Sequence, residues 1–156
     1  MNIRRAKKED ADGILSLLVQ VNNVHNAARP DLFIKNRTKY TKDELLSVLD
    51  DKNRPVFVAA DNENKVVGYC FGIFQSHKED NNFPDITTFY IDDLCVDETQ
   101  RGTHIGKALY EFAKNFAREN GCYNLTLNVW NGNDSAIHFY EKCGLRVQKY
   151  GLEEIL

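Results

Sequence analysis

The stretch from Ile86 to Val129 constrains the fold most, because its apolar residues change their spacing twice. Residues 86–96 form an apolar run rich in branched and aromatic side chains, which predicts a strand. Residues 105–117 carry an apolar stripe at helical spacing, and residues 123–129 alternate as a second strand. A strand, helix, strand unit normally pairs its strands in parallel through a right-handed crossover. Ligands are then expected at the carboxyl ends of these strands.

Two helices are expected before this unit. Apolar residues recur at helical spacing over residues 10–21, whereas residues 22–40 lose the period and indicate an irregular segment. Thr41 and Glu44 have the spacing of a capping box, so a short helix should run from there through Leu49.

Strands and a last helix complete the expected elements. Residues 56–60 and 66–74 are apolar runs separated by a polar turn, which predicts a β-hairpin. A final helix is expected from Asp134 to a stop at Gly144, and residues 145–150 are expected to add a last strand.

The composition narrows the class of protein. The chain has 156 residues, of which 42% are hydrophobic, so residues 1–156 are expected to form a single domain with one core. A formal net charge of −3 gives no cationic field for nucleic acid. No apolar window reaches the length of a membrane span and no leader pattern is present, which favours a cytoplasmic protein with no membrane partner.

The cysteines predict neither a metal site nor a disulfide framework. Cys70, Cys95, Cys122 and Cys143 lie far apart, contain no C-x-x-C pair and have mostly apolar neighbours. We therefore expect reduced, mostly buried thiols and no metal.

Residues 100–107 are predicted to form an anion-binding turn between a strand and a helix. Backbone N–H groups at a helix start have no partner in the helix, and the helix dipole attracts anions there. Arg101 adds a forked cation suited to phosphate. The spacing of Gly102 and Gly106 fits neither a Walker loop nor G-x-G-x-x-G, which disfavours a kinase or a dehydrogenase.

This turn resembles the coenzyme A turn of the GCN5-related N-acetyltransferases, which reads Gln or Arg, two variable residues, Gly, one variable residue, then Gly or Ala. Arg101 and Gly106 match it, whereas His104 stands where the family has its first glycine. Residues 133–145 resemble the family's Asn-x-x-Ala-x-x-Phe-Tyr-x-Lys-x-Gly-Phe block and differ at the last residue. Residues 90–96 are similar to its fourth strand.

The resemblance implies an α/β fold of the α+β kind, with a mostly antiparallel central sheet of about six to seven strands, a central parallel pair and about four flanking helices. It also implies an N-acetyltransferase that moves acetyl from acetyl-CoA to a primary amine within a ternary complex, without a metal. The coenzyme contacts that it implies are Leu94, Cys95, Val96, Gln100, Arg101, Gly102, Thr103, His104, Ile105, Gly106, Lys107, Asn133 and Tyr140.

The implied chemistry needs a proton acceptor and a proton donor. An alkyl amine, with a pKa of about 10.4, is protonated at neutral pH and must lose a proton before it attacks. Adjacent residues of an ideal strand face opposite sides, so only one of Asp92 and Asp93 is expected to point into the cleft. The resemblance favours Asp92, at the family's acidic position, with Asp93 second. Tyr140 matches the family's tyrosine that protonates the leaving thiolate. The plainer interpretation, of solvated carboxylates and a core tyrosine, stays open.

Three further expectations concern the turn and the partners. We expect His104 to be tolerated if its position is helical, because only a positive φ strongly penalises a side chain. Acidic residues near the strand end favour a cationic acceptor, either a small molecule or a protein amino group. A non-catalytic acyl-CoA-binding domain is the rival interpretation. An exposed sheet edge near the C-terminus would also permit a homodimer.

Overall fold

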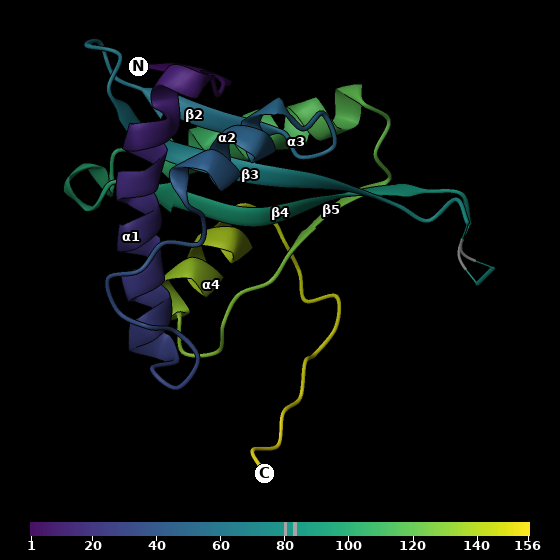
Figure 1. Cartoon of the computed structure of the whole chain (residues 1–156). Helices are drawn as coiled ribbons and strands as arrows, with labels where there is room; N and C mark the ends of the chain where they lie inside the picture. The colour runs from purple at the N-terminus through teal and green to yellow at the C-terminus, as the bar shows by residue number, and fades with distance from the viewer. Residues whose placement is uncertain (80, 83) are drawn as a thin grey trace.

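The computed structural model describes residues 1–79, 81–82 and 84–156. Five strands pair in the order β1-β2-β3-β4-β5, antiparallel except for the parallel pair β4 and β5. Short 3₁₀ turns precede α1 and α3 (Figure 1). In chain order the elements are β1 (Asn2–Arg5), α1 (Ala11–Ala28), α2 (Lys42–Asp50), β2 (Val56–Ala60), β3 (Val66–Ser76), β4 (Thr87–Val96), α3 (Ile105–Glu119), β5 (Asn124–Leu127) and α4 (Asp134–Lys142).

The mixed, mostly antiparallel sheet and the parallel pair of the strand, helix, strand unit are confirmed. The number of strands was overestimated, since the described residues form five strands instead of six to seven. The parallel pair was expected at the centre of the sheet and lies at its edge. The strand expected at residues 145–150 is absent from the described structure, where residues 146–156 are exposed. A strand needs a neighbour to bond its backbone N–H and C=O groups, and this segment instead leaves the body of the molecule (Figure 1).

Helix α1 is longer than its apolar period indicates, since it continues to Ala28 where an irregular segment was expected. Two of its polar side chains form hydrogen bonds with the backbone of residues 33–34, which lie beside the helix. The amide nitrogen of Asn22 donates to the carbonyl of Ile34 at 2.7 Å, and that of Asn26 donates to the carbonyl of Phe33 at 2.6 Å. The helix therefore extends because tertiary contacts satisfy residues that interrupt the apolar pattern.

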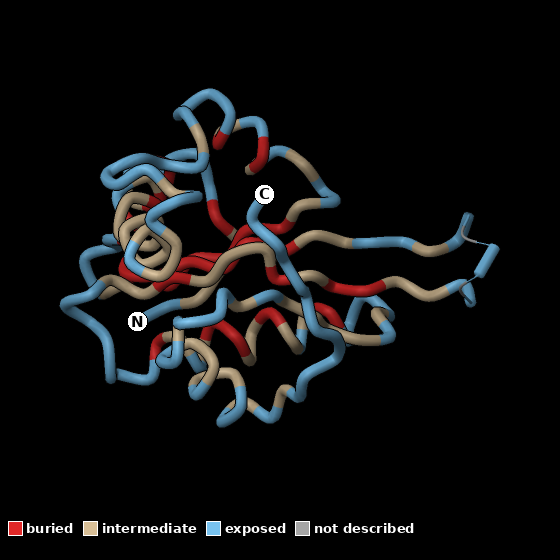
Figure 2. Tube along the Cα trace, turned by 90° about the horizontal axis from the view of Figure 1, so that it is seen from below, coloured by how far each residue is buried: buried red, intermediate tan, exposed pale blue. Residues whose placement is uncertain are grey.

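Helices cover both faces of the sheet, so β2 is buried along its whole length. Val56 and Val58 belong to the core that α1 and α2 share with the sheet. Phe57 and Ala59 belong to the core beneath α3. Successive residues of a strand point to opposite faces, and two covered faces explain the unbroken apolar run. Figure 2 shows this buried centre and the exposed C-terminal segment.

The core beneath α3 is built from aromatic rings. Phe57 meets the edges of Phe112 and Phe116, with ring centroids 5.1 and 4.9 Å apart. On the neighbouring strands, a Cβ added at Gly72 would lie 2.1 Å from the ring of Phe89. Glycine at this position therefore lets the Phe89 ring cross β3 and join the core.

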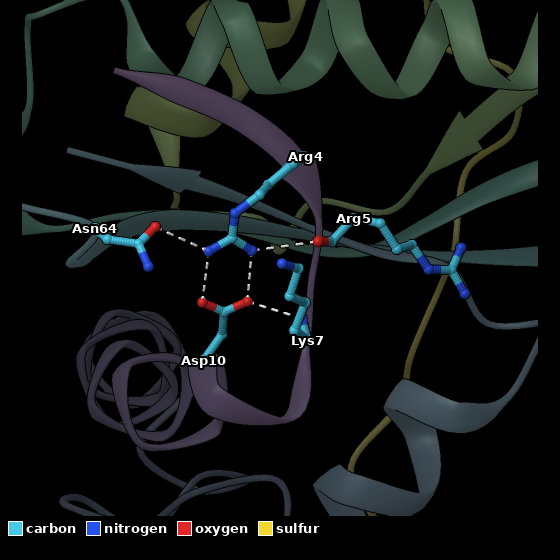
Figure 3. A network of polar contacts seen from close by, with 5 residues as sticks. All are labelled: Arg4, Arg5, Lys7, Asp10 and Asn64. Carbon is cyan, nitrogen blue, oxygen red and sulfur yellow. Dashed lines mark hydrogen bonds and ion pairs between the residues drawn. The ribbon is translucent and has the colours of Figure 1, made fainter. Parts of the chain in front are cut away.

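A buried ion pair joins β1 to the start of α1 (Figure 3). Arg4 donates to both carboxylate oxygens of Asp10, at 2.7 and 3.0 Å, and the side chain of Asp10 is only 5% exposed. The backbone N–H of Lys7 donates to the same carboxylate at 2.8 Å. The Asp10 carboxylate thus accepts three hydrogen bonds, and the ion pair holds the first strand against the start of the first helix.

Candidate active site

A large groove opens where β4 and β5 part. Their pairing ends at Ile91 and Leu127, whereas β4 continues to Val96 beside β3 alone. The groove belongs to a continuous space of about 2920 Å³ that extends to the exposed C-terminal segment. A typical site for one small molecule has roughly 300–1,000 Å³, so this volume covers more than one site.

A β-bulge places both acidic residues of β4 on the same side of the sheet. Phe71 pairs with Asp93 and Gly72 pairs with Ile91, so Asp92 is an extra residue without a partner on β3. The bulge therefore lies at Asp92, two residues before Leu94. Phe71 faces α1 and α2, and the residue opposite it faces the same way. The expectation that only one carboxylate can reach the cleft is therefore wrong: both line the groove.

The second acidic residue of the bulge, Asp93, is buried and has a perturbed protonation equilibrium. Burial raises the pKa of Asp93 to about 6, against the hydrogen bond from Tyr69 and the charge of Lys39. The hydroxyl of Tyr69 donates to Asp93 at 2.8 Å. A carboxyl with this pKa can exchange a proton near neutral pH.

Asp92 holds an ammonium group that the sequence pattern does not reveal. Nζ of Lys39 lies 2.6 Å from a carboxylate oxygen of Asp92, although the two residues are 53 positions apart. Burial opposes the charge, but the hydrogen bond to Asp92 and the charges of Asp92, Tyr40 and Asp93 raise the pKa of Lys39 above its ordinary value. No spacing rule links an irregular segment to a strand, so only the tertiary structure identifies this contact.

Tyr140 lies on α4 and lines the same groove. Burial raises the pKa of its phenol well above the ordinary value, and the neighbouring groups Cys70, Asp93 and Cys143 act in the same direction. Its ring also packs against Phe139, with centroids 5.0 Å apart. Tyr140 therefore packs against the core and keeps a protonated hydroxyl at the groove, and its role as a proton donor stays a prediction.

The turn at residues 100–107 lies between β4 and α3, as predicted. Gly102 has φ of 82°, a conformation that favours glycine. His104 caps α3 with φ of 66°, so the right-handed helical conformation on which its expected tolerance depended is not present. Histidine tolerates left-handed backbone better than most residues, at a cost of roughly 1–2 kcal/mol. The positive φ at this position explains why the family pattern has glycine there.

Restoring glycine at His104 should relieve this cost. The free energy of unfolding of His104→Gly is expected to rise by about 1 kcal/mol, partly offset by a more flexible unfolded chain. Urea unfolding measures the change. Lys107→Gly, inside the helix, is the control and should instead lower the free energy of unfolding by about 1 kcal/mol. Equal losses in both variants would contradict a backbone cost at His104.

The predicted coenzyme residues divide into two groups. The groove is lined by Leu94, Cys95, Val96, Arg101, Asn133 and Tyr140. The remaining predicted contacts lie outside its lining, in the turn and the first residues of α3. They are Gln100, Gly102, Thr103, His104, Ile105, Gly106 and Lys107. The side chain of Ile105 is buried in the core, so only its backbone is available to a ligand.

Asn133 and Cys95 also have structural roles. The side-chain oxygen of Asn133 accepts from the N–H of Ala136 at 3.3 Å and caps α4. Burial, with the charge of Asp93, raises the pKa of Cys95 to about 12. A thiol held protonated in this way is a poor nucleophile, which disfavours an acyl-enzyme at this residue.

An aromatic wall borders the groove and was not predicted. The ring of Phe33 packs at a tilt against that of His25, with centroids 5.0 Å apart, and meets the edge of Trp130 at 5.6 Å. The guanidinium of Arg29 lies 5.6 Å from the centre of Trp130. The wall joins the end of α1, the irregular segment after it and the loop after β5. Residues so distant in sequence give no shared pattern.

The described residues contain no group of three His, Cys, Asp or Glu side chains arranged to hold a metal ion. No helix in the described part of the chain is long and apolar enough to cross a membrane.

A sequence model described as the Acetyltransferase (GNAT) family matches residues 19–145. The chain belongs to this family. Its members use acetyl-CoA as the acyl donor, and the match includes the acidic residues of β4, the turn and α4.

Curated relatives and solved structures agree with this assignment. A probable glucosamine 6-phosphate N-acetyltransferase of Drosophila melanogaster is 27% identical over 92% of this chain, which spans 60% of that relative's length. The peptidyl-lysine N-acetyltransferase YjaB of Salmonella typhimurium is 28% identical over 94% of this chain and 84% of its own. The crystal structure of a tetramutant of the BH1408 protein of Bacillus halodurans is 29% identical, with a TM-score of 0.93 over 100% of both chains.

Proposed function

We propose that residues 1–156 act as one N-acetyltransferase domain, which transfers acetyl from acetyl-CoA to a primary amine by direct attack. The observation that carries this proposal is the ammonium of Lys39 bound to Asp92 in the groove, beside a second carboxylate and Tyr140. This set offers an amine-binding anion, a proton acceptor and a proton donor in one place.

Asp92 and Asp93 have separate roles in this proposal. Asp92 binds the acceptor's ammonium, in the way that it binds Lys39. Asp93 accepts the proton, because its pKa of about 6 is nearer to neutral pH than that of an ordinary carboxyl. The sequence favoured Asp92 as the base, whereas the pKa of Asp93 and the contact between Lys39 and Asp92 support Asp93 in this proposal.

The tetrahedral intermediate and the leaving thiolate need further donors. Backbone N–H groups of β4 beyond the bulge, at residues 94–96, are the candidates for the oxyanion. Arg101 and the start of α3 are suited to the coenzyme's phosphates. Tyr140 donates its proton to the thiolate. The burial that raises the pKa of Tyr140 would also make a thiolate there more basic, which helps the transfer.

Two assays test this function. Thiol release from acetyl-CoA is measured across a panel of primary amines, and coenzyme binding is measured separately by calorimetry. Turnover with at least one amine, reduced in Asp93→Asn and Asp92→Asn, supports the proposal. Tight coenzyme binding without acetylation of any amine would favour the non-catalytic acyl-CoA-binding alternative.

The pH dependence tests the proton acceptor. Asp93 must be ionised to act, so kcat/KM should rise with pH through about 6. The hydrogen bond from Tyr69 lowers the pKa of Asp93, and Tyr69→Phe should therefore move this rise to higher pH. Tyr110→Phe removes a buried hydroxyl from α3 and should leave the midpoint in place. If Tyr69→Phe leaves the midpoint of the pH profile unchanged, Asp93 is not the proton acceptor.

The acceptor class is narrowed by charge and by the relatives. The name of the Salmonella relative gives peptidyl lysine as its acceptor, and that of the Drosophila relative gives glucosamine 6-phosphate. Both acceptors carry a primary amine. The Lys39 contact favours a cationic amine for this chain. The four thiols, unpaired in the described structure, suit a reducing cytoplasm.

We also propose a homodimer formed through the C-terminal segment. β5 ends the sheet, and residues 146–156 expose apolar side chains, with Leu152 at 96% exposure. A partner's segment pairing with a free sheet edge would cover both. Truncation after Gly144 should therefore convert a dimer to a monomer in light scattering. Glu153→Gln keeps the apolar side chains and should remain dimeric. A full-length monomer would refute the proposal.

A further inference from the structure

The irregular segment after α1 places a primary amine, that of Lys39, at the acidic bulge of β4. Lys39 reaches Asp92 at 2.6 Å and lines the groove together with Asp93 and Tyr140. Its side chain is 46% exposed and that of Asp92 is 17% exposed, so the contact lies within the groove entrance.

The position of Lys39 is fixed by the residue after it. The ring of Tyr40 stacks on Phe71 with centroids 6.0 Å apart, and its hydroxyl accepts from Arg54 at 2.7 Å. Phe71 pairs directly with Asp93 across the sheet. The anchor of the segment thus contacts the same strands that carry the carboxylates, and Lys39 is held at the bulge.

We propose that Lys39 is a modification site of this protein, acetylated by its own domain from the acyl-CoA bound in the groove. This inference rests on the acetyl transfer proposed above. The ammonium of Lys39 gives a proton to a carboxylate of the bulge, and the neutral amine attacks the thioester carbonyl. The C–N bond forms and the C–S bond breaks. The thiolate takes a proton from Tyr140, and the proton that the attacking nitrogen loses goes to the Tyr140 oxygen. The products are an amide, free coenzyme A and the protonated carboxyl of the bulge.

Acetylation would change the charge of the site. An acetylated lysine is neutral and cannot form the ion pair with Asp92. The modification therefore frees Asp92 from Lys39 and removes a cation from the groove entrance. An external amine competes with Lys39 for Asp92 before the modification and not after it.

The test follows acetylation of the full chain by mass spectrometry after incubation with acetyl-CoA and no added amine. Lys35 belongs to the same segment and is exposed, so it reports background chemical acetylation. Lys39 should be acetylated at least about tenfold faster than Lys35, because the fold already holds its amine in the site. The Lys39 rate constant should not depend on protein concentration, and Asp92→Asn should lower it.

Variants separate the possible results. Lys39→Arg should abolish the fast modification, whereas Lys35→Arg should preserve it. Equal rates at Lys39 and Lys35, or a rate unaffected by Asp92→Asn, would overturn the inference. Acetylation of added amines with Lys39 untouched would overturn this inference alone. If coenzyme binds but neither Lys39 nor any added amine is acetylated, both this inference and the proposed function are overturned.

Discussion

Tyr140→Phe is expected to lower kcat by about 10²–10⁴-fold, the usual effect of removing a general acid. The thiolate would then leave without its proton donor, while the ring would keep its packing against Phe139. Steady-state kinetics at saturating acetyl-CoA measure kcat, and calorimetry measures coenzyme binding, which should change little.

Tyr110→Phe is the matched control for this experiment. Tyr110 is a buried tyrosine whose ring lies 6.5 Å from that of Tyr140, and it belongs to the core beneath α3. Its kcat should remain close to that of the parent protein. If Tyr140→Phe also keeps full kcat and only loses stability, Tyr140 is a core residue and another group protonates the thiolate.

Asp10→Ala is expected to lower the free energy of unfolding by about 3 kcal/mol, because it leaves the mostly buried Arg4 without its counter-ion. Asp12→Ala is the control. Asp12 pairs with Lys42 at 2.7 Å, but their side chains are 77% and 55% exposed. Loss of this exposed pair should cost about 0–1 kcal/mol. Urea unfolding of both variants measures the difference.

The Asp10 effect should depend on pH. Burial raises the pKa of Asp10, but the hydrogen bonds from Arg4 and Lys7 and their charges outweigh it, so the folded-state pKa is lowered. The stabilisation is therefore complete above the unfolded-state pKa of about 3.9 and is lost as pH falls through the folded-state value. The parent protein and Asp10→Ala should converge in acid. A gap that persists there would point to packing rather than charge.

Local patterns were sufficient to predict most elements of the fold. The capping box at Thr41, the alternation over residues 123–129 and the glycine stop at Gly144 are short-range signals, and the structure has an element boundary near each. The end of α1 was not predicted, because Asn22 and Asn26 bond to a segment that only the fold brings near. The segment after α4 has strand-like spacing, but spacing alone supplies no neighbouring strand.

The groove depended on long-range contacts in the same way. The sequence by itself determined the turn at residues 100–107, the acidic pair on β4 and Tyr140 on the last helix, because these are local motifs. Only the tertiary structure decided that a bulge turns Asp92 and Asp93 to one side, that Tyr69 and Lys39 reach them, and that His104 is left-handed. Local spacing fixes which face a residue occupies in a regular element. Register shifts and contacts between distant segments arise from packing the whole chain.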